Sequence, residues 1–170
     1  MSGRKTLTAE TLPQGFTLGM AAADALPVGL FCGSAVLLGL RLHSLLFWLG
    51  AGLCIAAGTG KVLWKLWIAL RQKNVWLLNR QMRVLMPLGF VLMCAALTLR
   101  RAWLSPQALA QGLLHGPSWI FFVLGTAGIA AMTVFARTED GANAQANWKE
   151  EATNTFAQAA FFAGIWLWRG

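Results

Sequence analysis

The chain has 170 residues, of which 57% are hydrophobic and only 12% are charged. An ordinary soluble domain is about 45–50% apolar and about 25% charged, so this composition excludes a water-soluble fold. The net charge of +8 does not indicate nucleic-acid binding, because most basic residues flank the apolar runs and form no basic face with interleaved aromatics. The sequence predicts an all-α, polytopic helical bundle in a lipid bilayer, with residues 1–170 in a single integral membrane domain.

The first two predicted spans form a helical hairpin. The first covers residues 15–42 and contains Pro27, which is expected to kink the helix and could divide it. The A-x-A triplet at residues 23–25 precedes most of this apolar run, whereas a signal-peptide cleavage site would follow it, so the first helix is expected to remain uncleaved. A tight turn at residues 41–44 leads to an unusually long second span, residues 45–70.

Three further spans are predicted in the rest of the chain. A polar and basic connector, residues 71–83, precedes the third span at residues 84–99. A short interfacial helix is expected to start at Ser105 and Pro106 and to close at residues 115–117, before the fourth span at residues 118–136. Residues 147–150 have the spacing of a capping box, so the fifth span is predicted at residues 148–168.

The distribution of basic residues predicts the orientation, because basic loops stay in the cytoplasm. With a cytoplasmic N-terminus, ten basic residues fall on the inner side and four on the outer side. The inner ten are Arg4, Lys5, Lys61, Lys65, Arg71, Lys73, Arg80, Arg83, Arg137 and Lys149, and the outer four are Arg41, Arg100, Arg101 and Arg169. The nine tryptophans fall near the two interfaces. We therefore predict a bacterial inner-membrane protein with its C-terminus outside.

Small residues at four-residue spacing predict how the helices pack, since helices in lipid associate through close backbone approach. The second span contains two such rows, and the first and fifth spans contain shorter ones. The rows are Gly50, Cys54 and Gly58; Gly52, Ala56 and Gly60; Gly29 and Gly33; and Ala160 and Gly164.

Ionisable residues inside apolar segments are costly in lipid, so they mark a functional site or a structural pair. Asp24 lies 19 residues before His43 and Lys61 lies 18 after it, which places both at similar depth in the predicted hairpin. The fifth span adds a polar stripe on one helical face, formed by Asn147, Glu151, Asn154 and Gln158. Gln158 and Lys61 both lie roughly 15 Å from the predicted cytoplasmic ends of their helices. The predicted ligand-binding residues are Asp24, Lys61, Lys65, Glu151, Asn154 and Gln158.

Two structural alternatives remain open for this cluster. The lysines could extend to the cytoplasmic headgroups, and the amides could bond between helices. No catalytic, metal or cofactor site is predicted: Cys32, Cys54 and Cys94 show no CxxC spacing, and the P-loop pattern fails around Lys61.

Three functions fit the pattern. The first is binding or transport of a small solute at the polar cluster in the cytoplasmic half of the bundle. The second is a non-catalytic subunit or assembly partner of a larger membrane complex, and the third is a lipid-modifying enzyme that uses Asp24, Glu151 or His43 as acid or base. The expected partners are the bilayer, a small solute, and a second membrane protein or a second copy of the chain.

Two families share general features with this sequence. Its length, five predicted spans and nine tryptophans resemble the tryptophan-rich sensory proteins, whose tryptophan and proline motifs are not found here. Ala21 and Ala25 resemble the A-x-x-x-A pattern in S-components of energy-coupling-factor transporters, which usually have six spans. Neither resemblance identifies a site residue.

Overall fold

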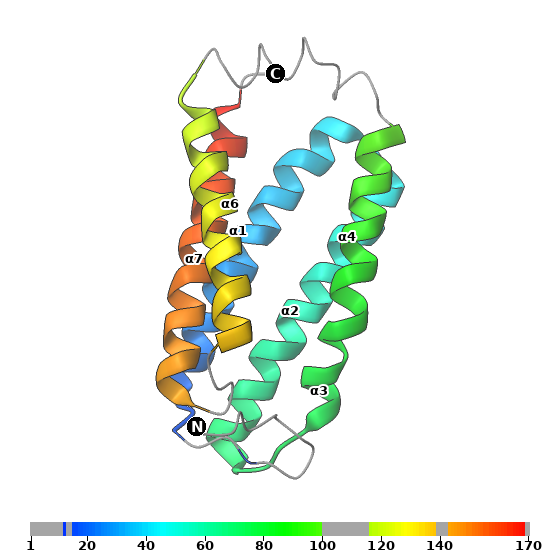
Figure 1. The fold of residues 1–170 in the computed structure, drawn as a ribbon. Coiled ribbons are helices and arrows are strands. Elements are labelled where there is room, and N and C mark those ends of the chain that lie inside the picture. Colours follow the sequence, from blue (N-terminus) through cyan, green and yellow to red (C-terminus); the bar gives the residue numbers. More distant parts are fainter. Residues whose placement is uncertain (1–11, 13–14, 100–115, 139–142, 169–170) are drawn as a thin grey trace.

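The structure, a computed structural model, describes residue 12 and residues 15–99, 116–138 and 143–168. All regular structure in these residues is helical (Figure 1). The helices are α1 (Leu18–Leu42), α2 (Leu45–Arg71), α3 (Trp76–Arg80), α4 (Met82–Leu99), α6 (Ser118–Thr138) and α7 (Ala144–Leu167). The predicted all-α class is confirmed.

Among the described residues, four helical segments are long and apolar enough to cross a membrane: Leu18–Leu42, Leu45–Arg71, Trp76–Leu99 and Ser118–Phe135. The fifth predicted span, α7, is more polar because Lys149, Glu150 and Glu151 lie in its first turns. Its 24 residues nevertheless rise by about 36 Å, which exceeds the roughly 30 Å hydrocarbon core of a bilayer. The chain is therefore a polytopic helical membrane protein.

The hairpin of α1 and α2 forms as the sequence predicts. Helix α1 begins at Leu18 because the Thr17 side chain accepts a hydrogen bond from the Met20 backbone N–H, and it continues through Pro27 without a break. Its end is marked by His43 in the left-handed conformation, with φ of 47°. The next residue, Ser44, caps α2 by accepting from the Phe47 N–H, which makes the turn tight.

The predicted starts of the third and fifth spans need correction. The third begins earlier, since α3 and α4 occupy most of the expected polar connector. Gln81 is tolerated at their junction because its side-chain amide donates to the Ala57 carbonyl of α2. The capping-box interpretation was wrong: Asn143 caps α7 by accepting from the Gln145 N–H, and Asn147 lies inside the helix. The expected interfacial helix falls outside the described residues.

The long helices pack in the order α6, α7, α1, α2, α4, each against the next (Figure 1). Helices α4 and α6 stand at the two ends of this row, and within the described residues they share no extended packing contact. In each helical hairpin of the row, α1 with α2 and α6 with α7, the two helices run in opposite directions. The bundle thus has one side where α4 and α6 face each other without packing together.

Several glycines in the predicted small-residue rows permit close helix packing. A Cβ on Gly50 would lie 2.6 Å from the Gly89 carbonyl oxygen, so α2 and α4 meet almost backbone to backbone. A Cβ on Gly58 would lie 2.9 Å from a methyl group of Val28, which brings α1 against α2. The other rows are used only in part, because a Cβ on Gly29 or Gly52 would meet nothing within 4 Å.

Tryptophans also mark the two ends of the bundle. Trp48, Trp119 and Trp166 are exposed toward one end, and Trp67 and Trp148 are exposed toward the other. This placement agrees with amphipathic rings at two membrane interfaces. Trp64 differs, since it is buried.

Candidate functional site

Five ionisable side chains from three helices meet near the start of α7. On α2, the Lys61 Nζ lies 3.0 Å from Glu151 Oε1 and 3.2 Å from Glu150 Oε1, both on α7, and 3.9 Å from Asp24 Oδ1 on α1. One turn further, Lys65 Nζ lies 3.3 Å from Asp24 Oδ2 and donates to Glu151 Oε1. We call these five residues the charged cluster.

The local sequence explains how the cluster assembles. Lys61 and Lys65 are four residues apart and therefore share one face of α2. The short turn at His43 makes α1 and α2 antiparallel, so Asp24 reaches the depth of the two lysines, as the equal spacing from His43 predicts. Glu150 and Glu151 lie two turns into α7, which runs beside α1. All three helices thus place their charges at one level.

The cluster is buried to different degrees. Side-chain exposure is 0% for Lys65, 1% for Glu151 and 3% for Asp24, but 13% for Lys61 and 30% for Glu150. The lysines are therefore held by carboxylates inside the bundle and do not extend to the headgroups. That sequence-based alternative is wrong for Lys65, which has no exposed surface.

The charged cluster contains more carboxylates than ammonium groups. Among the described residues it joins three carboxylates to two ammonium groups, which leaves one negative charge when all five are ionised. Glu151 uses Oε1 for both lysines, and its buried Oε2 has no hydrogen-bond partner there. An uncompensated charge in a low-dielectric interior is strongly unfavourable, so this arrangement favours uptake of a proton by a carboxylate or of a further cation.

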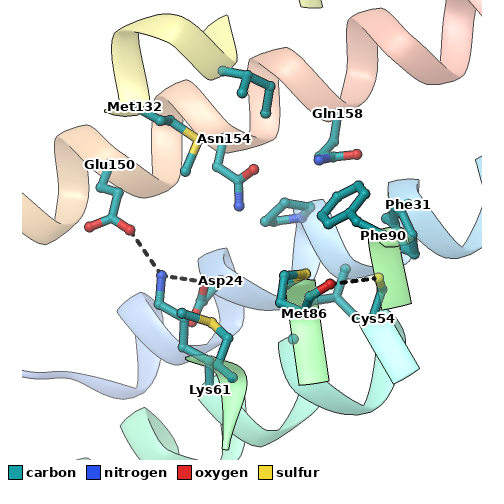
Figure 2. A pocket seen from close by; sticks show the side chains of 15 residues that line it. Asp24, Phe31, Cys54, Lys61, Met86, Phe90, Met132, Glu150, Asn154 and Gln158 are labelled. Carbon is teal, nitrogen blue, oxygen red and sulfur yellow. Dashed lines mark hydrogen bonds and ion pairs between the residues drawn. The ribbon is translucent and has the colours of Figure 1, made fainter. Parts of the chain in front are cut away.

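A cavity of about 240 Å³ adjoins the cluster. All five long helices line it: Asp24, Pro27, Val28 and Phe31 from α1; Cys54, Gly58 and Lys61 from α2; Met82, Met86 and Phe90 from α4; Ile129 and Met132 from α6; Glu150, Asn154 and Gln158 from α7. Figure 2 shows Lys61 between Asp24 and Glu150 at one end and the two phenylalanines at the other. The cavity therefore joins a charged end to apolar walls.

Two amides of α7 lie at this cavity without hydrogen-bond partners. Figure 2 shows Asn154 and Gln158 extending from α7 to the cavity. Neither side-chain amide makes a hydrogen bond within the described part of the chain, although both are half-buried. Their polar atoms are not fully buried, so water or a ligand in the cavity can form hydrogen bonds with both amides.

The predicted residues divide into two groups. Asp24, Lys61, Asn154 and Gln158 line the cavity, whereas Lys65 and Glu151 lie in the buried part of the charged cluster and do not line it. Whether these residues bind a ligand stays a prediction.

Sequence reasoning missed Glu150. The predicted stripe used Asn147 and Glu151, but Glu150, Asn154 and Gln158 follow one another at intervals of four, which would have identified the face toward the cavity. Asn147 instead donates to the Asn143 carbonyl of its own helix. The apolar walls from α4 and α6 carried no such signal, because most residues of those helices are apolar and the cavity-lining ones do not differ in type from the rest.

The enzyme interpretation gains no support from the geometry. His43 ends α1, 19 residues from Asp24, which is roughly 28 Å along a helix at 1.5 Å per residue. The three proposed acid–base residues therefore do not share a site, since Asp24 and Glu151 belong to the charged cluster and His43 does not.

No protein-family model matches this chain, and no curated protein and no solved structure shows significant similarity to it.

Proposed function

We propose that this membrane protein binds a small solute in the cavity between its five long helices and takes part in the transport of that solute. The ligand would contact Asp24, Lys61, Glu150, Asn154 and Gln158 at the polar end. Its less polar part would lie against the phenylalanines and methionines of the walls, as is common for small-molecule sites.

The unpaired amides of Asn154 and Gln158 carry this proposal. If these amides served only to hold helices together, each would form a hydrogen bond to a neighbouring helix. Neither amide has such a bond among the described residues. A polar solute that accepts from and donates to both amides would satisfy them. The ion pairs of the charged cluster would fix the positions of Lys61 and Asp24 at the cavity wall.

The cavity belongs to the end of the bundle that holds the start of α7 and the α2–α3 connection. We propose that this end faces the cytoplasm of a bacterial cell, because the ten-to-four distribution of basic residues favours it. A solute would then bind in the cytoplasmic half of the bilayer.

A second candidate function is that of a subunit in a larger membrane complex. One observation favours it: Gly52 and Ala56, four residues apart on α2, are both exposed, and a Cβ on Gly52 would meet nothing within 4 Å. Such a small-residue row is suited to close approach of a helix from another chain.

Native mass spectrometry of the full chain released from lipid nanodiscs tests the first proposal. We expect a reproducible small mass on the wild-type protein. Asn154→Leu keeps the side-chain volume similar but removes the amide, so the small mass should be lost. Thr153→Val is the matched control, because the Thr153 hydroxyl donates to the Lys149 carbonyl of its own helix and does not line the cavity. It should retain the bound mass.

A bare monomer in all three samples would contradict solute binding. A protein partner bound in fixed stoichiometry, with no small mass, would favour the subunit function.

A further inference from the structure

Helices α4 and α6 both line the cavity but share no extended contact in the described residues. Phe90 of α4 and Ile129 of α6 both line it, yet they are 48% and 40% exposed. Helices α4 and α6 end the packing row. Because both are apolar enough to lie in the bilayer, lipid would cover the surface outside an opening between them.

The charges around the cavity favour a positively charged ligand. The charged cluster carries one more carboxylate than ammonium among the described residues, and two of its carboxylates, Asp24 and Glu150, belong to the cavity wall. Lys61 is already within 4 Å of three carboxylates, so its charge is compensated. A monovalent cation in the cavity would balance the remaining charge.

The size of the cavity limits what fits inside. Its volume, about 240 Å³, is below the roughly 300–1,000 Å³ of sites that enclose a drug-sized ligand. A polar head with a short apolar portion fits, and a longer chain would pass between Phe90 and Ile129 into the lipid. Met82, Met86 and Met132 give the walls flexible thioether side chains that adapt to different apolar shapes.

We infer that the ligand is a cationic amphiphile, an amine with an apolar chain, that enters the cavity from the bilayer between α4 and α6. This inference rests on the proposed solute-binding function and specifies its substrate class. The ammonium head would lie beside the partly exposed Glu150 carboxylate, near the Asn154 amide oxygen. The chain would leave the cavity through the opening.

A competition experiment tests the charge of the head. The full-length protein in phosphatidylcholine nanodiscs is photolabelled with decylamine that carries a diazirine at the chain end. Unlabelled decylamine, 1-decanol or decanoate is added at equal mole fraction in the lipid. Decylamine should compete about tenfold more strongly than decanol, which corresponds to one desolvated charge interaction, and decanoate should compete least. Equal competition by decylamine and decanol would overturn the cationic head.

Two pairs of variants locate the interaction. Glu150→Gln should remove most of the preference for decylamine over decanol, whereas Lys149→Gln, a neighbouring change of an exposed residue outside the cavity, should keep it.

Ile129→Trp should fill the opening and reduce labelling several-fold. Val134→Trp, on the same helix, is the control, since Val134 is 55% exposed and does not line the cavity. Equal labelling of these two tryptophan variants would overturn entry between α4 and α6.

The two proposals fail in different ways. A bound mass that depends on Asn154, together with no saturable labelling by the amine, would overturn the substrate class and leave solute binding intact. No Asn154-dependent mass and no saturable labelling would overturn both.

Discussion

The two sides of α2 are held by different forces. Toward α1 and α7, Lys61 and Lys65 bind carboxylates in the charged cluster. Toward α4, Gly50 and Gly89 bring the two backbones together; we call these two residues the glycine junction. The charged cluster depends on the identity of each partner, whereas the glycine junction depends only on small volume. The charged cluster therefore contributes both to helix packing and to the candidate site, whereas the glycine junction contributes to helix packing alone.

The largest effect is expected where a buried charge loses its partner. Glu151→Ala removes the carboxylate shared by both lysines, and Lys65 has no exposed surface through which to reach water. Removing one member of a buried ion pair typically costs about 3–5 kcal/mol, so we expect a loss of that size in the free energy of unfolding. Denaturant titration of the protein in detergent micelles measures it.

A double variant separates the loss of the Lys65–Glu151 ion pair from other effects of the substitutions. Lys65→Met with Glu151→Leu removes both partners and should be less destabilised than the sum of the two single variants. Strict additivity, or a loss below about 1 kcal/mol for Glu151→Ala, would mean that the cluster contributes little to stability.

A smaller effect is expected at the glycine junction. Gly50→Ala places a methyl group 2.6 Å from the Gly89 carbonyl oxygen, which forces α2 and α4 apart. Overpacking of this kind costs about 1–3 kcal/mol. The same unfolding assay measures it, and the Asn154-dependent bound mass should persist because neither Gly50 nor Gly89 lines the cavity.

The control for this change is Gly52→Ala, two residues away on the same helix. A Cβ there meets nothing within 4 Å, so stability should stay unchanged or rise by up to about 1 kcal/mol from improved helix propensity. Equal losses at the two positions would contradict the assigned role of close packing.

The smallest effect is expected at the other end of α1 and α7. Arg41 Nη1 donates to the Trp168 carbonyl at 3.0 Å, which ties the C-terminal end of α7 to α1 far from the charged cluster. Arg41→Gln should cost about 1 kcal/mol, the net value of one such bond. Hydrogen exchange should become faster in the last turn of α7 and stay unchanged around Glu151. Unchanged exchange at both places would show that this bond does not hold the helix end.

Part of the site could be predicted from the sequence. Charged and amide residues stand out in apolar helices, because placing them in lipid costs free energy unless they have a partner or a function. The turn at His43 places Asp24 at the same level as Lys61. The same reasoning found Asn154 and Gln158 through their helical spacing. It chose a neighbouring stripe of α7, however, and so included Asn147 and omitted Glu150. A shift of one residue turns a helical face by about 100°, and hydropathy near a helix end does not fix that rotation.

The sequence by itself determined the membrane class, the hairpin of α1 and α2 and the depth of the polar residues, because each follows from composition, turn residues and helical rise. Only the tertiary structure decided which partners meet: that Glu151 binds both lysines, that Glu150 lines the cavity, and that α4 and α6 both line it without extended contact in the described residues. The physical reason is that helix rotation and neighbour order are set by packing between residues far apart in the chain. Apolar surfaces such as those of α4 and α6 carry no periodic signal that would reveal it.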